Sequence, residues 1–221
     1  PNTLFPYTTL SDLVAMDGFT GFKTAAAEEL PTAVAVMDPF HVVRLGGNAM
    51  DSCRRRVQQE LHGHRGLAGD ALYRARRTLH TGEDLLTDRQ RERLMLLFAD
   101  DDHVEVEATW GIVRRMIAAY RHPDRAAGRA AMTAVIDALR DGVPGRLVEL
   151  RRLGRTLNQR AGDVLAYFDR PGTSNGPTEA LNGRLEHLRG SALGFRNLTN
   201  YIARCLLETG GFRPVVHREM R

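Results

Sequence analysis

Three acidic residues stand where a protein could use them for chemistry: Asp17, Asp38 and Glu179. Asp17 and Asp38 each follow a short apolar run, and Glu179 falls just after Pro177, in the first turn of an expected helix. Carboxylate oxygens are the hard ligands that Mg²⁺ prefers. Two such ions, about 3.5–4 Å apart, can activate a water or a 3′-hydroxyl and stabilise the leaving oxygen of a phosphodiester. Spacing alone is weak evidence for such a site, because many proteins carry three acids this far apart.

Glu179 also has a simpler, structural explanation. An acidic residue in the first turn complements the helix dipole, Pro177 suits the start of a helix, and Gly176 or Asn175 can cap it. On local grounds this alternative stays open. The expected helix has a polar face with Glu179, Asn182 and Glu186, and an opposite face at core spacing with Leu181, Leu185 and Leu188.

Asp17 and Asp38 are expected at one edge of a parallel sheet. Residues 13–16 and 33–37 are apolar runs typical of buried strands, and residues 18–30 between them have helical spacing. Strand, helix and strand in so short a stretch predict a right-handed βαβ unit. Parallel strands end at the same edge of a sheet, which is where ligands bind in open α/β folds.

A long helix is expected over residues 39–63, directly after Asp38. His41 lies in its first turn. A lone histidine at a helix start is usually structural, but this one lies beside the two edge carboxylates. The apolar stripe of the helix is Met50, Cys53, Val57 and Leu61, and residues 54–56 lie mostly off it.

The following hundred or so residues are expected to be helical, with no further strand. Trp110 lies midway along one of these helices and is interpreted as a core anchor. Another helix is expected to follow Leu198. The helices expected in the long middle stretch cover residues 73–80, 88–98, 104–120, 125–140 and 147–168, the last as one continuous helix.

Charge and composition narrow the class of protein. The net charge is +4, and the stretch from Arg44 to Arg77, which includes Arg54, Arg55 and Arg56, is more basic than the rest. A polyanion is therefore a possible partner, although a solvated basic helix face explains the pattern equally well. No apolar run of about 18 residues predicts a membrane span. The isolated cysteines, Cys53 and Cys205, predict neither a disulfide framework nor a zinc site, which fits a cytoplasmic protein.

Four stretches resemble the catalytic region of DDE transposases of bacterial insertion sequences, specifically the ISL-three group. The most diagnostic is TSNGPTEALNGRLEHLRGSALGFRN at 173–197. The likeness covers roughly residues 12–214. The other three stretches are LVAMDGFTGF at 13–22, AVAVMDPFHVV at 33–43 and ATWGIVRRMIAAY at 108–120.

The resemblance implies an RNase H-like α/β fold, of which two parallel strands are recognisable here, with a large all-helical insertion before the glutamate-bearing helix. The chain is then mostly α overall. By the same resemblance, Asp17 is the second catalytic acid and Glu179 the third, and both bind metal. Asp38 and His41 match an acid-x-x-His element that supports the active site. Asp38 could instead be the second acid, but the strand order favours Asp17.

The resemblance also implies the reaction, which is the cutting and joining of DNA at insertion-sequence ends with two Mg²⁺ or Mn²⁺ ions in the intact enzyme. Such a transposase acts in the cytoplasm on the nucleoid, without a membrane, and the full-length protein is expected to be a homo-oligomer. The expected DNA-contacting residues are Arg54, Arg55, Arg56, Asn175, Asn182, Arg184, Arg189 and Arg196.

The chain is expected to be a fragment, because the strand with the family's first acid has no counterpart here and the first residue is Pro1. The isolated chain should then lack a complete metal site and show no strand transfer. Two alternatives are a non-catalytic DNA-binding or subunit-interaction remnant and a helical interaction scaffold. The expected divisions are an irregular or foreign segment (1–11), a βαβ remnant with the long helix (12–62), the helical insertion (63–170), the glutamate-bearing helices (171–212) and a tail (213–221).

Overall fold

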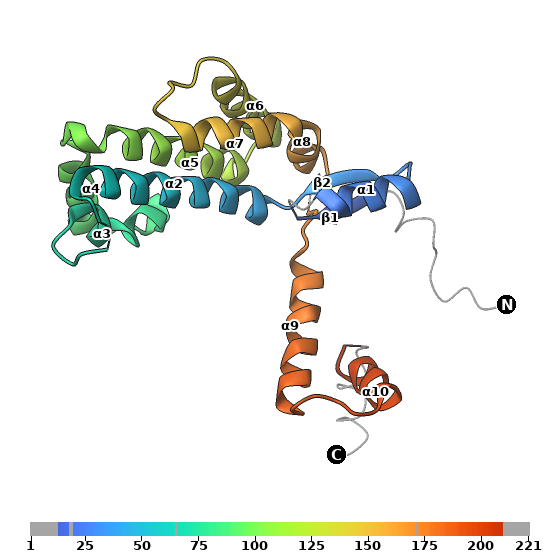
Figure 1. Cartoon of the computed structure of the whole chain (residues 1–221). Coiled ribbons are helices and arrows are strands. Elements are labelled where there is room, and N and C mark those ends of the chain that lie inside the picture. The colour runs from blue at the N-terminus through green and yellow to red at the C-terminus, as the bar shows by residue number, and fades with distance from the viewer. Residues whose placement is uncertain (1–12, 18–19, 65, 171, 210–221) are drawn as a thin grey trace. The chain divides into compact units, whose positions relative to one another are not determined.

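Residues 13–17, 20–64, 66–170 and 172–209 are described by a computed structural model (Figure 1). The expected segments 1–11 and 213–221 lie outside this described part. The chain divides into two units, Pro1–Thr173 and Ser174–Arg221. The position of one unit relative to the other is not determined, so each unit is described by itself.

The first unit begins with the expected βαβ element. Strand β1 (Leu13–Met16) and strand β2 (Val34–Met37) are parallel, and helix α1 (Thr20–Glu29) connects them. The register pairs Leu13 with Val34 and Met16 with Met37, so both strands end at the same level. Met16 and Met37 are buried, as the apolar runs predict. The sequence-based prediction of two parallel strands is confirmed.

Helix α2 (Pro39–His62) is the expected long helix and runs the length of the helical layer (Figure 1). Asp38 caps its N-terminus, and Pro39 occupies the first turn, where no backbone donor is needed. Gly63 ends the helix at φ +68°, a left-handed conformation that glycine adopts without strain, and its N–H donates to the Gln59 carbonyl at 3.0 Å.

The expected helical stretch forms the rest of the first unit. No helix among the described residues is long and apolar enough to span a membrane. Three of the expected helices are found at or near their expected bounds, whereas residues 73–80 form only short helical turns. The α-helices are α3 (Ala71–Ala75), α4 (Asp88–Phe98), α5 (Val104–Arg121), α6 (Arg125–Arg140), α7 (Val148–Gln159) and α8 (Ala161–Asp169), and the 3₁₀ turns are η1 (Thr78–His80), η2 (Glu83–Leu85) and η3 (Asp101–His103).

Residues 147–168 form two helices, and the prediction of one continuous helix is wrong. Arg160 separates α7 from α8 and has φ −109° and ψ 15°, outside the helical region. Its side chain is buried and paired with Asp163 at 2.5 Å. The apolar period continues across the break because Leu157 of α7 and Val164 of α8 belong to the same core. Periodicity therefore identified the buried face but not the turn.

Two apolar cores hold the first unit together. One lies among α2, α5, α6, α7 and α8 and includes Met37 of β2; the other lies among α2, α3, α4 and α5. Trp110 packs at the second core with Phe98, with ring centroids 5.3 Å apart, as expected of a core anchor. The largest fully buried side chains include Met50, Leu72, Leu79, Met116, Met132 and Leu157.

The described part of the second unit contains α9 (Gly176–Ser191) and α10 (Leu198–Thr209), which pack against each other. The turn between them includes Leu193 at φ +52° and Gly194 at φ +92°. Phe195 and Tyr201 contact each other with ring centroids 5.0 Å apart. Both expected helices are confirmed. The expected core face of α9 is not found within the described residues, because none of the residues of α9 is buried and Leu181 is 40% exposed.

The crossing of α6 and α7 depends on Gly154. A Cβ at this position would lie 2.5 Å from the Leu139 carbonyl oxygen, a backbone atom that cannot move aside. We expect Gly154→Ala to destabilise the protein by about 1–3 kcal/mol through overpacking, although alanine favours helix. Urea unfolding measures this. Gly111→Ala in α5 is the control, because no atom lies within 4 Å of its added Cβ, and it should be neutral or slightly stabilising. Equal effects of the two changes would contradict this account of the crossing.

Candidate active site

Asp17 and Asp38 lie at one edge of the two-stranded sheet, as expected. Each is the first residue after its strand, and the strands end in register at Met16 and Met37. The Asp38 N–H donates to the Met16 carbonyl at 3.0 Å, which continues the parallel pairing by one residue. The pairing therefore fixes the backbone at Asp38, and Asp17 directly follows the paired end of β1, so two acids follow adjacent strands at this edge.

Asp38 and Asp17 differ in environment. The Asp38 carboxylate accepts a hydrogen bond from the Phe40 N–H at 2.7 Å and so caps α2, and the residue is only 4% exposed. Asp17 is half-buried. His41 is buried in the first turn of α2, where its ring meets that of Phe40 edge-on at 5.7 Å. Asp38 thus has a structural role at the start of α2, and His41 belongs to the interior beside it.

A group of three charged side chains, of which Arg160 and Asp163 are buried, joins three elements beside this edge. Lys23 of α1 donates to both Asp163 carboxylate oxygens at 3.0 and 2.9 Å. Arg160 contacts the same carboxylate, and its Nη2 lies 3.5 Å from the sulfur of Met16, the residue before Asp17. These contacts hold the end of β1 against α1 and α8. Sequence reasoning missed this group; its signal was a pair of opposite charges three residues apart inside an apolar helical stretch.

Tyr120 of α5 is a second neighbour of the edge that sequence reasoning did not assign. Burial, with smaller contributions from the charges of Tyr167 and Asp38, raises the pKa of Tyr120 well above its usual range. The ring stacks on Phe168 at a centroid distance of 5.2 Å. Its hydroxyl is buried and has no hydrogen-bond partner among the described residues. Tyr120 therefore presents a neutral phenol to the region of Asp38.

Glu179 lies in the first turn of α9, in the second unit. Its N–H donates to the Asn175 carbonyl at 2.9 Å, so the helix already fixes its backbone. Asn175 stands at the cap position without a capping side-chain bond, and the Ser174 hydroxyl instead accepts from the Gly176 N–H at 3.0 Å. Glu179 is exposed, as are the other polar residues expected around it, Asn182, Arg184, Arg189 and Arg196.

Carboxylates of this kind suit a hard divalent cation. Asp17 directly follows a paired strand, and Glu179 lies in the hydrogen-bonded first turn of a helix. Within the described residues, no group of three or more His, Cys, Asp or Glu side chains that could hold a metal ion is found. The chemistry of the two acids fits Mg²⁺ or Mn²⁺. The structure brings Asp17, Asp38 and His41 to one edge and describes Glu179 in a unit of its own.

All three arginines of the run at 54–56, which were expected to contact DNA, form side-chain bonds within the first unit. Arg54 is 6% exposed and bonds to Gln58 and Asp51. The prediction that Arg54 lies off the apolar stripe is therefore wrong. Arg55 is half-exposed and pairs with Asp51 at 3.1 Å. Arg56 enters a cluster of acidic side chains. The arginine run therefore contributes more to helix packing than its sequence indicates.

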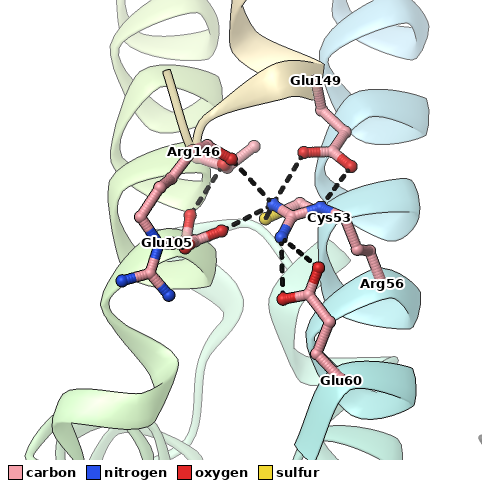
Figure 2. Close-up of polar contacts among 7 residues, drawn as sticks. Cys53, Arg56, Glu60, Glu105, Arg146 and Glu149 are labelled. Carbon is pink, nitrogen blue, oxygen red and sulfur yellow. Dashed lines mark hydrogen bonds and ion pairs between the residues drawn. The ribbon is translucent and has the colours of Figure 1, made fainter. Parts of the chain in front are cut away.

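Figure 2 shows the cluster around Arg56. The guanidinium bonds to Glu149 at 2.9 and 3.0 Å, to Glu105 at 2.6 Å and to Glu60 at 3.1 Å. Arg146 also pairs with Glu105, at 2.8 Å. These bonds, those to Glu149 first, raise the pKa of Arg56. Burial would raise the pKa of Glu149, but the hydrogen bond and charge of Arg56 outweigh it and the pKa of Glu149 is lowered. The cluster ties α2 to α5 and α7.

The acid-bearing edge, the helical layer and the glutamate-bearing helix together are the parts expected of a transposase. A family model described as a transposase matches residues 11–205, a range that includes Asp17, Asp38 and Glu179. The chain belongs to this family, the ISL-three group of insertion-sequence transposases. No curated protein and no solved structure matched the chain.

Proposed function

We propose that this chain is the catalytic part of a transposase that cuts and joins DNA at the ends of its insertion sequence. The observation that carries the proposal is the family match across both acid-bearing segments. In this proposal the βαβ unit and α9 belong to an RNase H-like core, and the helices from α3 to α8 are an insertion. Asp17 and Glu179 are the metal ligands.

The environment of the acids supports Asp17 over Asp38 as the ligand from the sheet edge. Asp38 is 4% exposed and caps α2, so its carboxylate already has a structural partner in the Phe40 N–H. Asp17 is half-buried at the end of a strand whose last residue contacts the buried Arg160 side chain. In our proposal Asp38 and His41 fix the start of α2 and so shape the edge at which Asp17 acts.

The two ligands are held by backbone structure that forms before any ion binds. Asp17 extends a paired strand, and Glu179 lies within a hydrogen-bonded first turn. Such positioning lowers the cost of ordering the site at the moment of reaction. When bound, two divalent ions would activate a water or a 3′-hydroxyl and stabilise the leaving oxygen of the phosphodiester. Asn182 and Arg184, exposed on α9, can orient Glu179 or meet DNA phosphates.

Excision of a marked insertion sequence in cells tests the proposed function. The element's two ends flank a selectable gene, and the full-length transposase that contains this chain is supplied from a second plasmid. We expect excision only when the transposase and both ends are present. Absence of excision from cells in which the protein accumulates and still binds DNA would contradict the catalytic proposal and favour the non-catalytic DNA-binding remnant.

A further inference from the structure

Helix α7 presents a row of arginines to solvent. Arg151, Arg152 and Arg155 are exposed, whereas the opposite face of the helix is buried in the core. Residues four apart lie one turn apart on the same side of a helix, so Arg151 and Arg155 are neighbours, with Arg152 beside them. The buried face is Leu150, Leu153, Gly154 and Leu157.

The charge of this row is not compensated by the helix itself. Glu149 is the only acidic residue of α7, and Arg56 holds both of its carboxylate oxygens, at 2.9 and 3.0 Å (Figure 2). Arg152 interacts with Glu149 only at longer range. Among the described residues, none of the three arginines forms an ion pair. Other exposed arginines of the helical layer do, including Arg121 with Asp84 and Arg129 with Asp169.

Shallow grooves flank α7 on both sides, toward its neighbours α6 and α2. The groove toward α6 is lined by Arg140 and Asn158 as well as by Arg151 and Arg155. The groove toward α2 is lined by small polar side chains as well as by Arg152. No aromatic residue lines either groove. The residues of the two grooves are Leu139, Arg140, Gly142, Val143, Arg151, Gly154, Arg155 and Asn158 toward α6, and Leu45, Asn48, Ala49, Ser52, Glu149, Arg152, Leu153 and Thr156 toward α2.

We propose that the arginine row of α7 binds the phosphate backbone of duplex DNA. The inference rests on the proposed function, which makes DNA the polyanion that this protein meets. Arginine forks match phosphate oxygens, and backbone contacts position a protein on DNA without reading its sequence. Single-stranded DNA is the less suitable ligand because its binding sites use aromatic side chains for base stacking. The row therefore adds a sequence-independent DNA contact to the helical layer.

Salt-dependent binding of the whole chain to a fluorescein-labelled duplex of mixed sequence tests the proposal. The variant carries Arg151→Gln, Arg152→Gln and Arg155→Gln, all at exposed positions. The control carries Arg115→Gln, Arg121→Gln and Arg129→Gln, which remove the same charge from exposed positions of α5 and α6. Thermal unfolding checks that both proteins remain folded.

The α7 variant should lose affinity by about tenfold per phosphate contact near 0.1 M salt, and the slope of log affinity against log salt should fall by about 0.9 per contact. The control should stay close to wild type, and a single-stranded probe should bind the wild type no more tightly than the duplex. Equal losses in both variants would overturn the proposal in favour of diffuse charge. Unchanged binding by the α7 variant would also overturn it, and would leave an acidic protein surface as the partner. These binding measurements do not depend on excision. A failure of the proposed catalytic function would therefore show in the excision assay and not in the binding of the duplex.

Discussion

Glu179→Gln is expected to reduce excision of the marked element below about a hundredth of the wild-type frequency. The amide keeps the size of the side chain and removes the negative charge with which the carboxylate would attract and hold Mg²⁺. Changes to residues that only support a metal ligand cost about 10–100-fold, so loss of a ligand should cost more. The helix should persist, because the Glu179 backbone bond to Asn175 is unaffected.

Glu186→Gln is the matched control for this change. Glu186 lies on the same face of α9, is exposed, and pairs with Arg189 at 2.8 Å. Its loss should leave excision within a few-fold of wild type. Asp17→Asn should match Glu179→Gln, whereas Asp38→Asn should be milder, because asparagine caps helices as well as aspartate does. Equal loss in the Glu179 and Glu186 variants would contradict the assignment of Glu179 as a metal ligand.

Arg56→Met is expected to lower the free energy of unfolding by about 3–5 kcal/mol, because it removes the partner of the buried Glu149 carboxylate and one of the two arginines that pair with Glu105. The Glu105 and Glu149 side chains are only 8% and 13% exposed, and Arg56 bonds to both. Methionine replaces much of the apolar volume of the arginine stem, so the loss reports the charge. Urea unfolding at neutral pH measures the difference between the two proteins.

The neighbouring change Arg55→Met is the control. Arg55 is half-exposed, and its ion pair among the described residues is with Asp51 on its own helix, so its removal should cost no more than about 1 kcal/mol. Similar losses in both variants would contradict a special role of the Arg56 cluster. The two substitutions are at adjacent positions and remove the same charge. Effects of the net charge on stability therefore cancel when the two variants are compared.

The Arg56 effect should also depend on pH. The pKa of Glu149 is lowered from its usual value of 4.5 in the folded protein, chiefly because the Arg56 bond outweighs the effect of burial. Its stabilising contribution is therefore present above about pH 4.5 and is lost as the pH falls through the lowered folded pKa. The stability difference between wild type and Arg56→Met should shrink in acid. A difference that stays constant from neutral pH to pH 3 would contradict this account.

The sequence predicted those parts of the fold whose signals are local. The apolar runs before Asp17 and Asp38, and the Asp-Pro start of α2, placed both strands and the long helix near their observed bounds. The two acids at one edge followed from the prediction that the two strands are parallel. Glu179 in a first turn followed from Pro177 and the turn residues before it.

The features of the fold and the site that the sequence did not predict depend mostly on tertiary packing. Arg56 looked like part of a solvent-facing basic run, but its acceptors include Glu105 and Glu149, which are 49 and 93 residues away in the sequence. The turn at Arg160 was hidden because the apolar period continues through it into α8. The uncompensated charge of the α7 arginines becomes evident only from the structure, in which Glu149 bonds to Arg56. Periodicity identifies buried faces, whereas the partner of a buried charge is set by tertiary packing.

Anomalous diffraction from Mn²⁺ in crystals of the transposase bound to its insertion-sequence end tests the central claim most directly. The account predicts manganese peaks within bonding distance of the Asp17 and Glu179 carboxylates, with Asp38 still accepting the Phe40 N–H at the start of α2. Carboxylates of Asp17 and Glu179 that lie too far apart to share a pair of metal ions, or manganese bound at Asp38 without Asp17, would contradict it.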